Sequence, residues 1–284
     1  MLSMLHHVGP GPRRPARAWR ARTLVAAGVC TAALATGCGP QSQAAAPPAR
    51  GGLSVSYDVP TAGESDERAF LKERRLPERV ADDLNGSLRL RKRIDIIGTT
   101  CKKDATPEYD PETARIVLCY GFVREVRSMF EADGAAAPAD RTAGVISETL
   151  YHEAAHALID RLDLPFTGRE EDVADQFAAY RLLDQGAPGR AALLAAADNY
   201  AQYARESDPS DTDPSDEHAP DAVRSANYRC YLYGAARGPA AGERPRLVDG
   251  KRLSKERAAL CEQEYASLRR GWTRLLAPYA AARR

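Results

Sequence analysis

Residues 151–180, with the sequence YHEAAHALIDRLDLPFTGREEDVADQFAAY, contain the most informative pattern of histidines and acids in the chain. His152 and His156 are four residues apart, and Glu153 directly follows the first of them. On a helix, residues four apart lie on one face, so the two imidazoles can bind one Zn²⁺ at about 2 Å. The alternative is an exposed helix that happens to carry two histidines. The pattern predicts a metal site on a helix over residues 142–162.

A catalytic zinc needs a third protein ligand and one open position. Pro165 and Gly168 can end the first helix, and a second helix is expected over residues 168–185. Glu171 and Asp175 are four apart on it and share the face that would look back at the histidines. We expect Glu171 to be the third ligand, and Asp175 to accept a hydrogen bond from the free ring N–H of a ligand histidine.

The same acids have a simpler explanation. Glu170, Glu171 and Asp172 fall in the first helical turn, where the helix dipole favours negative charge. Asp172 lies about 100° around the helix from Glu171 and is expected to point away. The position of the Glu171 carboxylate relative to the two imidazoles distinguishes the explanations.

The spacing H-E-x-x-H is the signature of zinc metallopeptidases. The metal lowers the pKa of a water molecule, and the glutamate beside the first histidine takes its proton. Glu153 is therefore the expected general base. Other routes to catalysis fail, because the sequence has no G-x-S-x-G motif and no glycine-rich phosphate loop.

The N-terminus has the layout of an export signal. Five arginines without acids precede an apolar run of about a dozen residues, which predicts a secretory signal peptide over residues 1–37. The run ends in LATGC, residues 34–38, which resembles the lipobox of bacterial lipoproteins, with Ala35 where leucine is usual. The resemblance implies cleavage before Cys38 and a lipid on its thiol. Ordinary cleavage with release and a retained anchor are the alternatives.

Residues 38–52 are rich in Pro, Gly, Gln and Ala and predict a flexible linker to a folded domain over 53–284. Removal of residues 1–37 leaves 35 basic side chains against 39 acidic ones, a net charge of −4. This sign, and the lack of a basic stripe with interleaved aromatics, exclude nucleic acid as a partner. The expected location is the outer face of a membrane, through the lipid anchor, or the medium if the protein is released.

Four cysteines remain after loss of Cys30 and lipidation of Cys38, an even number in an oxidising compartment. We expect disulfides Cys101–Cys119 and Cys230–Cys261, because each pair flanks one local unit. A four-cysteine zinc site is the alternative, but no C-x-x-C spacing supports it.

The remaining sequence predicts one α+β domain, with a small N-terminal sheet and a mainly helical C-terminal half. The expected strands cover 53–59, 93–101 and 114–122, with a helical region over 66–90 and a surface loop over 133–140. The further expected helices cover 142–162, 168–185, 188–205, 219–233 and 254–279, with polar loops at 205–217 and 234–246.

Several stretches together resemble a known family. H-E-x-x-H followed by E-x-x-A-D is similar to the gluzincin branch of the zincin peptidases. The chain resembles a family of bacterial secreted metallopeptidase-like proteins over about residues 53–279. The stretches that carry this resemblance are HEAAHALID, LPFTGREEDVADQFAAY, DEH, YRCYLYG and RLSKERAALCEQEY. The resemblance implies a zincin-like fold, one Zn²⁺ per chain and a peptide or protein substrate.

His218 is the only histidine of the mature chain outside the zinc motif. Zincin mechanisms need a donor for the developing oxyanion, which His218 can supply. Tyr228, Tyr231 and Tyr233 are weaker candidates. The alternative is that residues 216–218 form a helix start.

The sequence thus favours a membrane-anchored zinc peptidase. A metal-binding envelope lipoprotein without peptidase activity is the first alternative, and a purely structural envelope protein is the second. The metal motif argues more strongly against the second.

Overall fold

The computed structural model describes residues 51–61, 63–103, 105–207 and 215–281. These residues belong to one compact unit that covers residues 47–284. The expected signal peptide, the Cys38 lipidation site and nearly all of the expected linker lie outside the described residues. Among the described residues, no helix has the length and apolar character needed to cross a membrane.

A four-stranded sheet forms in the order β1-β2-β4-β3. Its strands are β1 (Gly52–Tyr57), β2 (Arg93–Thr99), β3 (Glu108–Asp110) and β4 (Arg115–Cys119). Strands β1, β2 and β4 are parallel, and β3 pairs antiparallel with β4 at one edge. The side chains of Ile94 and Ile96 in β2 and Ile116 in β4 are fully buried, as expected for strands covered by helices.

Two details near the sheet differ from the sequence prediction. The helical region expected over 66–90 is two helices, α1 (Ser65–Arg74) and α2 (Leu76–Ser87), because Arg75 between them has a left-handed backbone with φ 52°. The strand expected to reach residue 122 ends at Cys119, where α3 (Tyr120–Ala132) begins at once. The buried Tyr120 hydroxyl donates to the Gly98 carbonyl at 2.8 Å, which ties the start of α3 to β2.

The rest of the described chain is helical. Its α-helices are α4 (Pro138–Leu162), α5 (Glu170–Asp184), α6 (Ala187–Glu206), α7 (Asp221–Ala235), α8 (Arg244–Leu247) and α9 (Lys255–Leu276). Helix α4 starts within the loop expected over 133–140, because Pro138 suits the first helical turn. Residues expected as the loop 234–246 include a 3₁₀ helix, Gly238–Glu243, and the start of α8.

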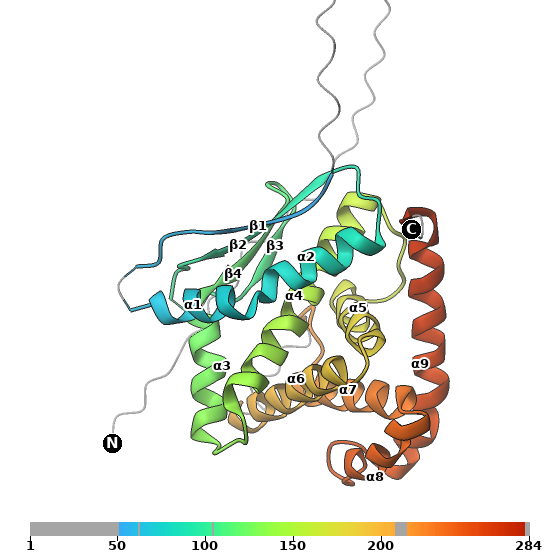
Figure 1. Ribbon diagram of the computed structural model, residues 1–284. Coiled ribbons are helices and arrows are strands. Elements are labelled where there is room, and N and C mark those ends of the chain that lie inside the picture. Colours follow the sequence, from blue (N-terminus) through green and yellow to red (C-terminus); the bar gives the residue numbers. More distant parts are fainter. Residues whose placement is uncertain (1–50, 62, 104, 208–214, 282–284) are drawn as a thin grey trace, which may run out of the picture. The chain divides into compact units, whose positions relative to one another are not determined.

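Helix α4 holds the central position and carries the histidine pair. Figure 1 shows it between the sheet and helices α5, α6 and α7. It contacts β3 and β4 on one side and α5 and α6 on the other. The expected α+β fold class is confirmed, with the small sheet packed on the histidine helix.

A partly buried polar cluster connects α4 to its neighbours next to the site. The Tyr151 hydroxyl, one residue before His152, donates to Asp83 of α2 at 2.8 Å. Arg181 of α5 donates to the same carboxylate with two nitrogens, at 2.6 and 3.1 Å. One carboxylate of α2 thus accepts hydrogen bonds from both α4 and α5, which holds the three helices together next to the site.

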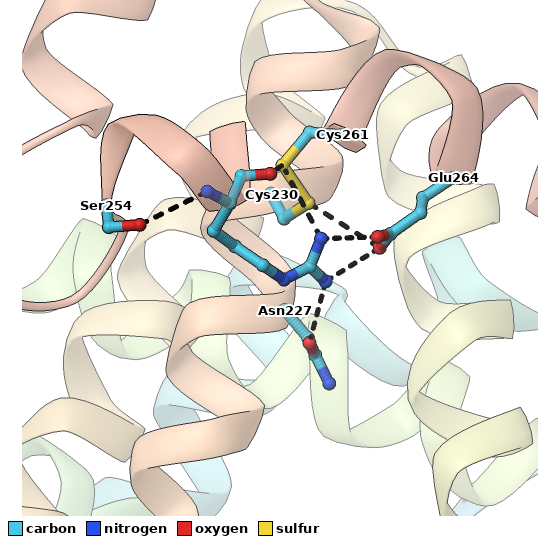
Figure 2. Close-up of a disulfide and its surroundings, with 6 residues drawn as sticks. Asn227, Cys230, Ser254, Cys261 and Glu264 are labelled. Carbon is cyan, nitrogen blue, oxygen red and sulfur yellow. Dashed lines mark hydrogen bonds and ion pairs between the residues drawn. A yellow bond between two sulfur atoms is a disulfide. The ribbon is translucent and has the colours of Figure 1, made fainter. Parts of the chain in front are cut away.

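Both predicted disulfides are confirmed, with S–S distances of 2.02 Å for Cys101–Cys119 and 2.00 Å for Cys230–Cys261. The second joins α7 to α9, with Asn227 and Glu264 beside it (Figure 2). In the loop-entropy account each disulfide adds about 3 kcal/mol to the free energy of unfolding. The α7–α9 link matters for function because α7 contributes side chains to the site described below.

The close contact between α7 and α9 gives a stability prediction. A methyl group at Gly234 of α7 would lie 2.2 Å from the carbonyl oxygen of Cys261 in α9. Gly234→Ala should therefore lower the free energy of unfolding by about 2–3 kcal/mol. The matched control is Gly271→Ala in α9, where the described residues place no atom beyond the local helix backbone within 4 Å of the added methyl group, and stability should rise by about 0.5–1 kcal/mol. Denaturant unfolding of the oxidised proteins measures both, and an unchanged Gly234→Ala midpoint would contradict the packing.

Candidate metal centre

The two histidines of the zinc motif lie on one face of α4, as their spacing predicts. The Nε2 atoms of His152 and His156 are 3.2 Å apart. Both rings are largely shielded from solvent, and His152 is 5% exposed. Glu153, between them in sequence, is 7% exposed.

Glu171 reaches these histidines from α5. Its Oε2 atom lies 3.0 Å from Nε2 of His152 and 3.3 Å from Nε2 of His156. The chain reverses between α4 and α5 through Asp163 and Gly168, whose φ angles are 52° and 96°. Asp172 points away, as expected, and forms an exposed ion pair with Arg169. The carboxylate that sequence reasoning chose thus lies against both imidazoles rather than in solvent.

These three side chains fit a zinc ion. In a tetrahedral site with zinc bonds of 2.0–2.2 Å, neighbouring ligand atoms lie about 3.3–3.6 Å apart. The three separations between the Nε2 atoms and the Glu171 oxygen are 3.0, 3.2 and 3.3 Å. Two imidazoles and one carboxylate are also a donor set found in catalytic zinc sites. The spacing and the chemistry of the donors therefore both suit the metal.

Carboxylates hold the outer nitrogen of each histidine of the motif. Nδ1 of His152 lies 2.9 Å from Asp175, the contact expected from the sequence. Nδ1 of His156 lies 2.8 Å from Glu170. Its sequence position predicts only a helix-terminal charge for Glu170, but the start of α5 places its carboxylate beside the ring of His156. Such contacts orient the Nε2 atoms of ligand histidines towards the metal.

Asp175 belongs to a buried network that sequence reasoning missed. Arg224 of α7 donates to both of its oxygens, at 2.6 and 2.9 Å. Tyr228, one turn later, lies 3.0 Å from Asp175 and also bonds Glu148. Glu148 precedes His152 by four residues on α4, so helical periodicity places it on the same face as the histidines. No local sequence pattern indicates its contact with Tyr228 on α7.

The pKa shifts follow from this burial and pairing. Burial, and then the nearby Asp175 charge, raise the pKa of Glu148 to about 7. Burial opposes ionisation of Asp175, but the Arg224 guanidinium and His152 hold its pKa below its ordinary range. Burial lowers the pKa of His152, but its hydrogen bonds to Asp175 and Glu171 outweigh this and raise it to about 10. The carboxylates therefore strongly stabilise positive charge where the imidazoles meet.

His218 joins the site from the segment before α7. Its Nε2 atom lies 3.1 Å from Oε2 of Glu171, and its Nδ1 atom lies 3.2 Å from Asp216. The three tyrosines considered as alternatives are placed differently. Tyr228 and Tyr231 are buried, Tyr233 packs under Arg244, and none of the three is among the described residues that line the cleft beside the site.

A cleft of about 730 Å³ opens beside the histidines and is lined by His152, Glu153 and His218. Its other walls come from α3, α6 and the start of α7 and include Phe122 and Tyr200. Burial, partly opposed by the two histidines of the motif, raises the pKa of Glu153. A buried carboxylate of raised basicity at the wall of a cleft suits a proton acceptor.

Comparison with protein families gives a match over most of the chain. A family model with the description "Putative metallopeptidase" matches residues 57–276. Comparison with the curated proteins and with the solved structures gives no match. The matched segment contains the two histidines of the motif, Glu171 and His218. The chain belongs to this metallopeptidase family.

Proposed function

We propose that this protein is a zinc-dependent peptidase that hydrolyses amide bonds of peptides or proteins. The observation that carries the proposal is the convergence of His152, His156 and Glu171 close to the spacing of tetrahedral zinc ligands, beside a cleft that is lined by Glu153. The order of the site residues along two successive helices, H-E-x-x-H and then E-x-x-A-D, supports a zincin-like arrangement.

Zinc is the ion that these donors favour. Imidazole nitrogens with one carboxylate suit zinc, whereas magnesium and calcium prefer all-oxygen sites. When bound, the ion polarises the substrate carbonyl and makes a water molecule acidic near neutral pH. His152, His156 and Glu171 would hold it, and Asp175 and Glu170 keep the two rings in position.

Glu153 carries the proton transfer. Its carboxylate is buried at the cleft wall, where it can take a proton from the attacking water. The protonated Glu153 then gives this proton to the leaving amine, which completes cleavage of the amide bond. His218, whose ring lines the same cleft, is proposed as the hydrogen-bond donor to the oxygen of the tetrahedral intermediate.

The proposed place of action is outside the cytoplasm. The export signal over residues 1–37 and the lipobox-like residues before Cys38 support a lipoprotein held on the outer face of a membrane by residues 38–52. The peptidase domain proposed over 53–284 would then meet extracytoplasmic peptides or proteins. Release into the medium is the alternative.

One observation favours a second candidate function, a metal-binding envelope lipoprotein without peptidase activity. His218 lies against the same Glu171 oxygen as the two ligand histidines, which narrows access to the metal position. Peptide cleavage distinguishes the two candidates.

Two measurements on the same protein test the proposal, its zinc content and its cleavage of peptides. Protein prepared without chelator should contain about one zinc per chain and should cut members of a broad peptide library, with products identified by mass spectrometry. Chelation should abolish cleavage and added zinc should restore it. A fully zinc-loaded protein that cuts no peptide would favour the second candidate, and a protein without zinc would contradict both.

A further inference from the structure

The three described histidines share one pattern of contacts. In each ring Nδ1 faces a carboxylate, which is Asp175, Glu170 and Asp216 for His152, His156 and His218 respectively. In each ring Nε2 faces the same atom, Oε2 of Glu171, at 3.0, 3.3 and 3.1 Å in the same order. His218 therefore repeats, in both nitrogens, the arrangement of the two motif histidines.

This arrangement is typical of metal ligands. A histidine that binds a metal through one nitrogen usually donates the other N–H to a carboxylate or carbonyl, which fixes the ring. A hydrogen bond to Glu171 alone would account for Nε2 of His218 but not for the carboxylate at Nδ1. The 3.1 Å separation from Glu171 is also close to the spacing of neighbouring ligands around zinc, about 3.3 Å.

The backbone holds His218 in this place. Its N–H donates to Asp216 at 2.9 Å, and its carbonyl accepts from Arg169, directly before α5, at 3.3 Å. Its ring lies nearly parallel to that of His152, with centroids 6.5 Å apart. Ligand atoms of His152, Glu171 and His218 all lie within 4.8 Å of one another. The His218 side chain is 48% exposed and lines the cleft.

We propose that His218 is a fourth protein ligand to the metal in the resting protein, where it fills the position otherwise open to solvent. This inference rests on the proposed metal site. Its consequence is a closed resting state in which a substrate must displace His218 before it can react. The displaced imidazole stays tethered by Asp216 at the cleft, where it can donate to the substrate oxygen as proposed above.

Metal affinity and metal spectroscopy test the inference without reference to activity. Zinc affinity is measured by competition with a chromophoric chelator, and coordination by the visible spectrum of the cobalt(II)-loaded protein. His218→Ala should weaken zinc binding by more than the roughly 10–100-fold typical of outer contacts, and it should change the cobalt spectrum, because water replaces a nitrogen ligand. Glu217→Gln, a change at the exposed neighbouring residue, is the matched control and should alter neither.

An unchanged cobalt spectrum in His218→Ala would overturn the inference and leave His218 as a hydrogen-bond partner of Glu171, even if zinc affinity fell by the roughly 10–100-fold typical of outer contacts. Equal unfolding temperatures of the metal-free proteins exclude misfolding as the cause of any loss. The peptide library separates this outcome from failure of the proposed function. If zinc binding depends on His218 but no peptide is cut, His218 is a ligand and the peptidase proposal is refuted. If peptides are cut but zinc binding does not depend on His218, the peptidase proposal holds and the fourth ligand is refuted.

Discussion

Glu153→Gln should abolish peptide cleavage while the protein keeps its zinc. Glutamine has the shape of glutamate but cannot accept the proton of the attacking water, so the turnover number should fall about 10³-fold or more. Metal content should not change, because the expected ligands are His152, His156 and Glu171. The measurement is kcat on a peptide found in the library, together with zinc per chain.

The matched control for this change is Glu131→Gln, an exposed position on α3. Its kcat and its zinc content should equal those of the parent. Cleavage by Glu153→Gln at the parent rate would refute the mechanism, whereas loss of zinc in the same variant would mean that Glu153 helps to hold the metal. Measuring both quantities on one preparation keeps these outcomes apart.

Glu171→Ala should greatly weaken the binding of zinc to the protein. Glu171 supplies the oxygen at which both motif histidines point, at 3.0 and 3.3 Å. Removal of a direct ligand should weaken zinc binding by more than the roughly 10–100-fold typical of outer contacts. Cleavage should then disappear at low zinc concentration. Chelator competition gives the dissociation constant.

Asp172→Ala, one residue further on α5, is the control. Its carboxylate pairs with Arg169 at the surface, an interaction worth about 0–1 kcal/mol, so zinc affinity should stay at the parent value. Equal zinc affinity in Glu171→Ala and the parent would remove Glu171 from the ligand set. Because the two positions are adjacent and acidic, the comparison also tests the explanation by helix-terminal charge.

Much of the candidate site could be predicted from the sequence, because its main parts are local. His152 and His156 share a face of α4, and Glu171 and Asp175 share a face of α5, through the helical period alone. The short connection between the two helices leaves few ways to arrange them, which is why the carboxylate that lies beside both rings could be predicted. Both disulfides were predictable for a related reason, since each closes a local unit.

Local boundaries were harder to predict than the elements themselves. Arg75 divides one expected helix into two because its backbone is left-handed, a state with no strong signal in an arginine. Pro138 starts α4 earlier than expected because proline at a helix start looks, in sequence, like part of a loop. The short edge strand β3 was missed, since three residues carry too little periodicity.

The helix that carries the histidine pair, its expected base Glu153 and the acid that faces the two rings follow from local sequence alone. Their surroundings depend on the packing of distant helices. Arg224 and Tyr228 meet Asp175, and His218 meets Glu171, after the chain has passed through α6 and returned. The physical reason is that helical periodicity places side chains within one or two neighbouring helices, whereas contacts with α7 depend on how whole helices pack against α4 and α5.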